Sequence, residues 1–146
     1  MIIKELTREA CNAILLESRL GRLACVSDNR PYVVPISFVF ADNHIYSFSM
    51  IGQKVEWMRK NPQVCLQVDD FQQRREWSSV VVHGAYEELQ DRIGSKRERE
   101  HAWSLLSKHA TWWEPGSLKP VPAAGTEHVF YRIRIETLTG RRAGVA

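Results

Sequence analysis

One short stretch of the chain, residues 46–54 (YSFSMIGQK), carries residue types that suit a phosphate group. Ser47 and Ser49 alternate at the end of an apolar segment, and Gly52 then permits a tight turn. Lys54 falls in the first turn of the helix expected to follow. The free N–H groups and the positive dipole end of a helix start attract anions, and two hydroxyls and an ammonium would add to that attraction. A serine-bearing strand end before a capped helix is also a common structural pattern, so this segment alone leaves both interpretations open.

The histidines and serines lack the spacing that metal binding or serine hydrolysis would require. The five histidines show neither the H-E-x-x-H nor the H-x₃₋₅-H spacing of a metal site, so we expect no metal. The chain has no G-x-S-x-G elbow, which argues against a serine hydrolase. No residue stands out as a general acid or base, and catalytic residues therefore remain unassigned.

Composition narrows the class of protein. The 146 residues are 44% hydrophobic and 25% charged, as in one ordinary globular domain spanning 1–146. No apolar run reaches the length of a membrane span, and the N-terminal segment does not resemble a signal peptide, so we expect a cytoplasmic protein without a membrane partner. A net charge of +3 is too small for the basic surface of a nucleic-acid binder. Cys11, Cys25 and Cys65 lie in apolar patterns and are expected to be buried free thiols.

The pattern of apolar residues and turn residues predicts a mainly β chain with three helices. Helices are expected over residues 7–19, with Thr7 as N-cap, over 53–60, ending before Pro62, and over 92–110. Loops are expected at 69–76 and 111–125, and a basic tail at 139–146. Since no strand–helix–strand alternation occurs, we predict a six-stranded antiparallel barrel. Its strands are expected at residues 22–27, 32–40, 44–49, 64–68, 77–89 and 127–138.

Two of these strands are apolar on both faces. Val80, Val81 and Val82 follow one another, and the segment 32–40 is similar. A strand with one face in water would alternate apolar and polar residues, so something must cover the second face. We expect a second copy of the chain to cover it across a two-fold axis, which makes the protein a homodimer.

Four blocks in the order PYVVPISFVF, IYSFSMIGQK, RKNPQVCLQVD and WSSVVVHGAYEEL resemble the FMN-binding split-barrel family typified by pyridoxamine 5′-phosphate oxidase. Within that family the chain is most similar to small bacterial proteins related to nitroimidazole reductases. The resemblance implies a homodimeric split barrel that binds FMN at the dimer interface.

The resemblance also implies three groups of cofactor contacts. The first runs along the isoalloxazine ring, the second grips the ribityl phosphate, and the third reaches the flavin near the dimer interface. In this order the groups are Val34, Pro35, Ile36 and Ser37; then Ser47, Phe48, Ser49, Gln53 and Lys54; then Trp77, Ser78 and Ser79.

Departures from the family pattern argue against the vitamin as substrate. Ser37 stands where the pyridoxamine phosphate oxidases carry a lysine, and Gln53 stands where they carry an arginine. Their C-terminal Trp and Arg pattern has no clear counterpart in residues 131–134. Loss of one phosphate arginine is expected to weaken FMN binding without abolishing it, because the serines and the helix start partly compensate.

The function implied is therefore that of an oxidoreductase that passes electrons from a reduced nicotinamide, NAD(P)H, to a small-molecule acceptor. Two alternatives remain: a non-catalytic barrel that holds flavin or haem as a reservoir or sensor, and a deazaflavin-dependent reductase. Trp112 and Trp113 in the Pro-rich loop either cover the exposed face of the flavin or pack on the barrel.

Overall fold

The structure, a computed structural model, describes residues 1–145 except 74, 91–93, 95 and 109–127. No helix of the described residues connects two parallel neighbouring strands. The strands are β1 (Ile2–Glu5), β2 (Leu20–Ser27), β3 (Arg30–Ser37), β4 (Val39–Ala41), β5 (His44–Met50), β6 (Gln63–Gln73), β7 (Glu76–Leu89) and β8 (His128–Gly144), and the helices are α1 (Arg8–Glu17), α2 (Gln53–Lys60) and α3 (Lys96–Lys108).

All strand pairs are antiparallel and belong to one sheet. The strand order is β3-β2-β6-β7-β8-β5-β4, with β1 added on β8. The two outer strands of this order, β3 and β4, follow each other in sequence with only Phe38 between them, so the sheet must curl until its edges meet. The Ser47 hydroxyl on β5 donates to the Ser37 carbonyl on β3 (2.6 Å) where they meet. The predicted mainly β antiparallel class with flanking helices is confirmed.

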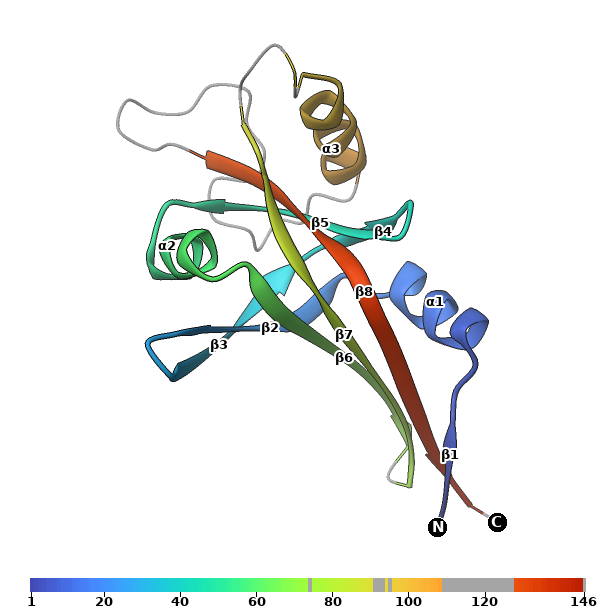
Figure 1. Cartoon of the computed structure of the whole chain (residues 1–146). Helices are drawn as coiled ribbons and strands as arrows, with labels where there is room; N and C mark the ends of the chain where they lie inside the picture. Colours follow the sequence, from blue (N-terminus) through green and yellow to red (C-terminus); the bar gives the residue numbers. More distant parts are fainter. Residues whose placement is uncertain (74, 91–93, 95, 109–127, 146) are drawn as a thin grey trace.

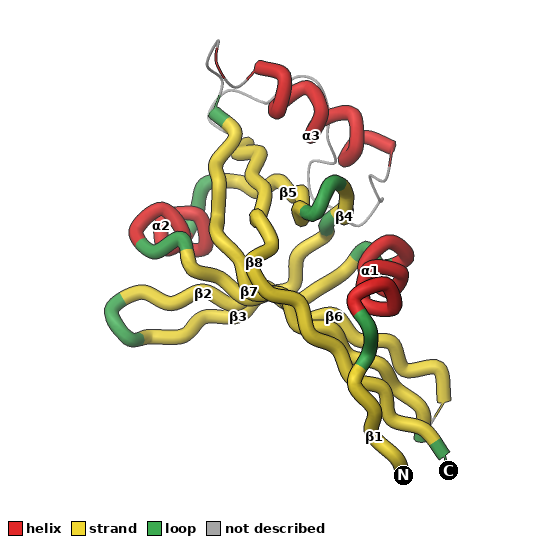
Figure 2. Tube along the Cα trace, turned by 45° about the vertical axis from the view of Figure 1, so that its right-hand side comes forward, coloured by secondary structure: helices red, strands yellow, loops and turns green. Residues whose placement is uncertain are grey.

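The strands extend well beyond the closed part of the sheet. Strands β6, β7 and β8 run on together as one long arm, and the chain termini meet at its far end, where β1 pairs with β8 (Figure 1). Helix α1 lies beside β8, α2 lies on the opposite side, and α3 lies at the end away from the termini (Figure 2).

The predicted number of six strands is wrong, since the described residues already form a sheet of eight. The predicted strand 32–40 is two strands, β3 and β4. Phe38 interrupts them because its side chain is fully buried and its N–H donates to the Arg19 carbonyl (2.9 Å) instead of to a ladder. The N-terminal strand β1 was not predicted.

Two further predictions fail in the arm. Residues 69–76 were expected to form a loop, but β6 continues to Gln73 and β7 begins at Glu76. Residues 139–146 were expected to form a tail, but β8 continues to Gly144 and pairs with both β1 and β7. Backbone pairing on a neighbouring strand satisfies the N–H and C=O groups whatever the side chains are, so these polar segments form strands without an apolar pattern.

The helices agree better with prediction. The Thr7 hydroxyl accepts from the Ala10 N–H (3.2 Å) and caps α1, as expected, and α2 has the predicted bounds. Helix α3 lies within the predicted range 92–110, and its Lys96 and Glu100 form the predicted pair (3.9 Å). The ends of that range and the loop with Trp112 and Trp113 lie outside the described residues.

The core fills the curled sheet and a second cluster beneath α3. Cys11 and Leu15 bring α1 onto the main cluster, while Leu106 brings α3 onto the second one. Cys11 and Cys25 are buried free thiols as predicted, and Cys65 is only partly buried. Within the described part of the chain, no helix is both long and apolar enough to cross a bilayer.

Candidate functional site

The predicted phosphate site lies where β3 and β5 end and α2 begins. We call Ser37, Ser47, Ser49, Gln53 and Lys54 the serine–lysine cluster; of these, a hydrogen bond joins Ser37 and Ser47, and Lys54 lies near Cys25 of β2. Ser47 is 1% exposed, and its proton is held by the Ser37 carbonyl. The Ser49 hydroxyl is partly exposed and donates to the Met50 carbonyl (2.9 Å). Both hydroxyl oxygens keep lone pairs, but a phosphate would have to compete with these carbonyls for the two protons.

Phe48 lies between the two serines and faces the other way. Its ring packs near His128 and Phe130, with centroids 5.9 and 6.3 Å away, and it contacts the core cluster beneath α3. Successive strand residues point to opposite faces, so Phe48 anchors β5 while its neighbours point toward the closure of the sheet.

Lys54 is the cation of the cluster. Burial lowers the pKa of this lysine, while the nearby Cys25 thiol raises it slightly. Among the described residues, no carboxylate or hydrogen-bond acceptor pairs with its ammonium. A half-buried ammonium that lacks a partner gains most from an incoming anion, because it has already lost part of its hydration.

The start of α2 adds backbone donors beside Lys54. Gly52 is the N-cap and has no side chain to cap the helix, and the first helical hydrogen bond runs from the Glu56 N–H to the Gly52 carbonyl (3.0 Å). The N–H groups of the first turn thus have no acceptor within the helix. Together with Lys54, this arrangement fits a doubly negative phosphate.

A partly exposed ion pair holds α2 on the sheet. The Arg59 guanidinium donates to both carboxylate oxygens of Glu88 on β7 (2.7 and 3.1 Å), and the Tyr86 hydroxyl donates to the same carboxylate (2.7 Å). These hydrogen bonds, that of Arg59 first, lower the pKa of Glu88, whereas burial raises the pKa of Tyr86. The pair holds the helix that carries Lys54 in one position.

The segment predicted to face the flavin ring forms the end of β3. Ile36 and Val34 point into the core, whereas Pro35 is exposed. In the described part of the sheet, β3 pairs only with β2, so the backbone groups on its other edge have no ladder partner. A free strand edge of this kind can offer N–H and C=O groups to a flat polar ring.

Trp77, Ser78 and Ser79 lie at the start of β7, and the strand separates their side chains. Ser78 is 7% exposed and accepts from Arg142 Nε (3.0 Å) on the side toward α1. Ser79 points to the opposite face, where it accepts from Gln67 Nε2 (3.1 Å). Among the described residues, no hydrogen bond connects these residues with the serine–lysine cluster.

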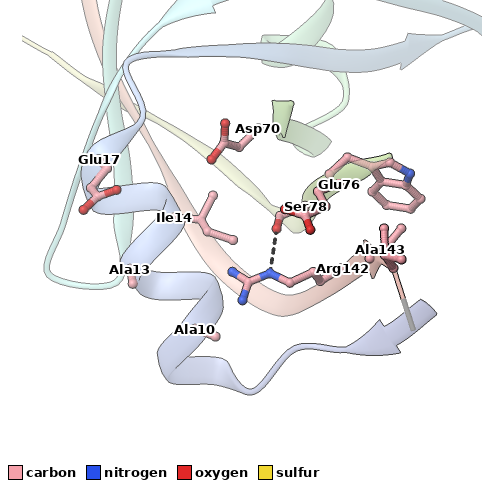
Figure 3. A pocket seen from close by; sticks show the side chains of 12 residues that line it. Ala10, Ala13, Ile14, Glu17, Asp70, Glu76, Ser78, Arg142 and Ala143 are labelled. Carbon is pink, nitrogen blue, oxygen red and sulfur yellow. Dashed lines mark hydrogen bonds between the residues drawn. The ribbon is translucent and has the colours of Figure 1, made fainter. Parts of the chain in front are cut away.

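Ser78 lines a cavity that the sequence did not predict. It has a volume of about 540 Å³ and lies between α1 and the arm. We call it the α1 pocket; its walls include Ala13, Ile14, Glu17, Asp70, Ser78 and Arg142 (Figure 3). It was missed because Asp70 and Arg142 fall in the segments predicted to be a loop and a tail. Neither segment alternates apolar and polar residues, so the sequence carried no local signal for this cavity.

Residues 7–142 match the protein family described as Pyridoxamine 5'-phosphate oxidase. The chain belongs to this family. The resemblance found in the four sequence blocks is therefore confirmed, and with it the split-barrel fold.

Close and distant relatives agree on the fold. A crystal structure of a FAD-binding protein from Mesorhizobium loti is 51% identical, covers 99% of this chain and 100% of its own, and superimposes with a TM-score of 0.83. An uncharacterized protein from Rhizobium meliloti (strain 1021) is 47% identical over 98% of this chain and 97% of its own length. The FAD-binding protein from Mycobacterium smegmatis is 20% identical, with a TM-score of 0.67 over 99% and 100% of the two chains, which shows the shared fold.

Proposed function

We propose that this member of the family is a flavoprotein, acting as a homodimer that passes electrons from a reduced nicotinamide to a small acceptor. The observation that carries the proposal is the 51% identity, over essentially the whole chain, with a protein described as FAD-binding. The serine–lysine cluster supports it independently, because an unpaired, half-buried ammonium beside an uncapped helix start is a place for a phosphate.

The cofactor we propose is FMN, with FAD as the alternative. Both contain the isoalloxazine ring, the ribityl chain and a phosphate on that chain, so Lys54 and the first turn of α2 suit either one. FAD is the alternative because the Mesorhizobium loti relative is described as FAD-binding. FAD would need additional room for its adenosine phosphate beyond the serine–lysine cluster.

The residues divide the work of binding. Lys54 and the α2 amides would hold the phosphate, the free edge of β3 from Val34 to Ser37 would hydrogen-bond the polar edge of the ring, and the core behind β3 would keep water away. A bound flavin supplies the hydride or electron transfer. No side chain of this chain is required as a general acid or base for that transfer, and we assign none.

The outer face of the barrel is the surface proposed for the second copy. One row of paired residues crosses this face, with Val33 on β3, Ala24 on β2, Cys65 on β6 and His83 on β7. Val33 is 62% exposed, and Ala24 and Cys65 are partly exposed. The apolar part of this row, Val33, Ala24 and Cys65, is costly to leave in water, so a two-fold partner would stabilise it. Ser79 lies on this same face, which would bring it to the interface, where the third group of flavin contacts is proposed.

The chromophore itself tests the proposal. The purified protein is denatured, and the released compound is identified by chromatography and mass as FMN, FAD, a deazaflavin or haem. The intact protein is then mixed anaerobically with NADH or NADPH. Bleaching of the flavin absorbance, with recovery on adding a nitroaromatic acceptor, is the expected result. A Soret band, or failure of the apoprotein to take up any flavin, would refute the flavoprotein proposal, and bound flavin that no nicotinamide reduces would refute the electron-transfer role.

A further inference from the structure

The face of the sheet turned toward the core changes character under α1. Val68 on β6 and Val80 on β7 are paired and fully buried in the barrel. Two residues further along, the paired row consists of Asp70, Ser78 and Arg142 on β6, β7 and β8. All three line the α1 pocket. Beneath α1 the row thus changes from buried valines to the buried Ser78 between two exposed charged side chains, which indicates a surface suited to a polar molecule.

Arg142 is held in position but keeps part of its binding capacity. Its Nε donates to the buried Ser78 hydroxyl (3.0 Å), and the guanidinium points into the pocket toward α1 (Figure 3). Among the described residues, nothing accepts a hydrogen bond from its two terminal nitrogens. A guanidinium fixed at Nε presents these nitrogens as a fork, which is the geometry that binds a carboxylate.

The wall formed by α1 supplies room and the opposite charge. Ala10 and Ala13 are small and leave space, and Ile14 adds apolar surface. Glu17, in the last turn of α1, is exposed to the same cavity and has no ion-pair partner among the described residues. The Glu17 carboxylate and the Arg142 guanidinium form no salt bridge with each other.

From this arrangement we propose that the α1 pocket binds a small zwitterion with an apolar body, an α-amino acid or a close analogue. The carboxylate of the ligand is held by Arg142, its ammonium by Glu17, and its apolar part by Ile14 and the alanines of α1. Arg142 and Glu17 carry opposite charges and form no ion pair with each other, so together they fit a molecule that carries both charges better than a simple cation or anion. Ser78, which the family resemblance groups with the flavin contacts, holds Arg142 here, whereas Ser79 on the opposite face of the sheet is left to the proposed flavin site.

Three probes with one apolar body separate the two charges. L-phenylalanine carries both charges, 2-phenylethylamine only the ammonium, and 3-phenylpropanoate only the carboxylate. Each is titrated into the full-length protein as purified, with binding followed by calorimetry and the bound flavin by its absorbance. We expect L-phenylalanine to bind about tenfold or more tightly than either analogue, since each lost charged contact costs about one order of magnitude.

Matched variants locate the contacts. Arg142→Gln should reduce the affinity for L-phenylalanine to about that for 2-phenylethylamine, while Arg141→Gln, next to it on β8 and directed to the other face, should leave it unchanged. Glu17→Gln should reduce it toward the affinity for 3-phenylpropanoate, with Glu9→Gln on the same helix as control. The far-ultraviolet circular dichroism and melting temperature of each variant establish that it is folded.

Several results would overturn the proposal. These are no saturable binding of L-phenylalanine, equal or tighter binding of 2-phenylethylamine, equal effects of Arg142→Gln and Arg141→Gln, or release of flavin as the amino acid binds. The last result would assign the pocket to the flavin, whereas failure of the flavin test under Proposed function would leave the amino-acid titration unaffected.

Discussion

Replacing Lys54 by glutamine is expected to weaken flavin binding by one to two orders of magnitude. The ammonium lacks a partner among the described residues, so the variant breaks no existing ion pair and leaves no buried carboxylate behind. The loss is then the contact with the phosphate alone. A hydrogen bond between charged groups contributes about 1.5–3 kcal/mol, and 1.36 kcal/mol corresponds to a factor of ten, so the dissociation constant should rise roughly 10- to 150-fold.

The assay is a titration of apoprotein with FMN, and separately with FAD, followed by quenching of flavin fluorescence at low and high salt. Lys60→Gln is the matched control, because it removes the same charge from the exposed last turn of the same helix. We expect Lys60→Gln to change the affinity less than twofold. The salt dependence should fall in the Lys54 variant, since one cation no longer contributes.

The pH dependence gives a second measure of the same contact. Burial lowers the pKa of Lys54, so the apoprotein loses this charge at a lower pH than an exposed lysine would, and flavin affinity should decrease as pH rises through that range. Lys54→Arg keeps its charge and should flatten the profile. Equal effects of the Lys54 and Lys60 glutamine variants, or an unchanged dissociation constant in Lys54→Gln, would refute the phosphate site.

Three further predictions concern the parts that hold the site. The pKa of Glu88 is lowered in the folded protein, so this carboxylate stabilises the fold fully above its unfolded pKa near 4.5 and loses that effect as pH falls through the lower folded pKa. Glu88→Gln should therefore reduce the free energy of unfolding at pH 7 by about 1 kcal/mol and remove this acid-sensitive contribution. Glu56→Gln, on the exposed side of α2, should do neither. In Gly84→Ala the new Cβ would overlap the backbone carbonyl oxygen of Arg134 on β8 and lie 2.7 Å from Ile133 Cγ2, so chemical denaturation should show a loss of about 1–3 kcal/mol. At Gly94 no described atom lies within 4 Å, and alanine should be tolerated. Val33→Glu puts a charge on the proposed dimer face and should give monomers in analytical ultracentrifugation, and a dimer of unchanged stability would contradict the interface.

Much of the closed part of the fold was predictable from local patterns. The Thr7 cap, the stop before Pro62 and the turn residues at 28–29 and 42–43 act through their own backbone geometry. Among the described residues, the non-glycine residues with positive φ are the Asp-Asn pairs of these two turns. Each of these features depends on residues close in sequence, which is why single-sequence reasoning finds them.

The arm was not predictable in the same way. Residues 69–73 and 139–144 are polar, and they are strands because β7 lies between β6 and β8 and pairs with both. Such pairing is decided by segments far apart in sequence, and no local propensity encodes it.

The candidate site shows the same division. The residues of the serine–lysine cluster that lie on β5 and α2 are close in sequence, and the grouping was visible from their spacing. The α1 pocket joins Glu17, Asp70 and Arg142 from three distant segments, so the sequence alone gave no reason to group them. The opposite directions of Ser78 and Ser79 follow from the pleat once residues 76–79 are known to lie in a strand.

The central place of β8 has a consequence for how the protein is made. This strand follows the other described strands in sequence, lies between β7 and β5 and also pairs with β1. Until it leaves the ribosome, β7 and β5 each present an unpaired edge and the barrel has no route to closure. Closure of the sheet therefore depends on residues 128–134 of β8, which pair with β5. Loss of this segment would leave the β5 edge open to edge-to-edge aggregation.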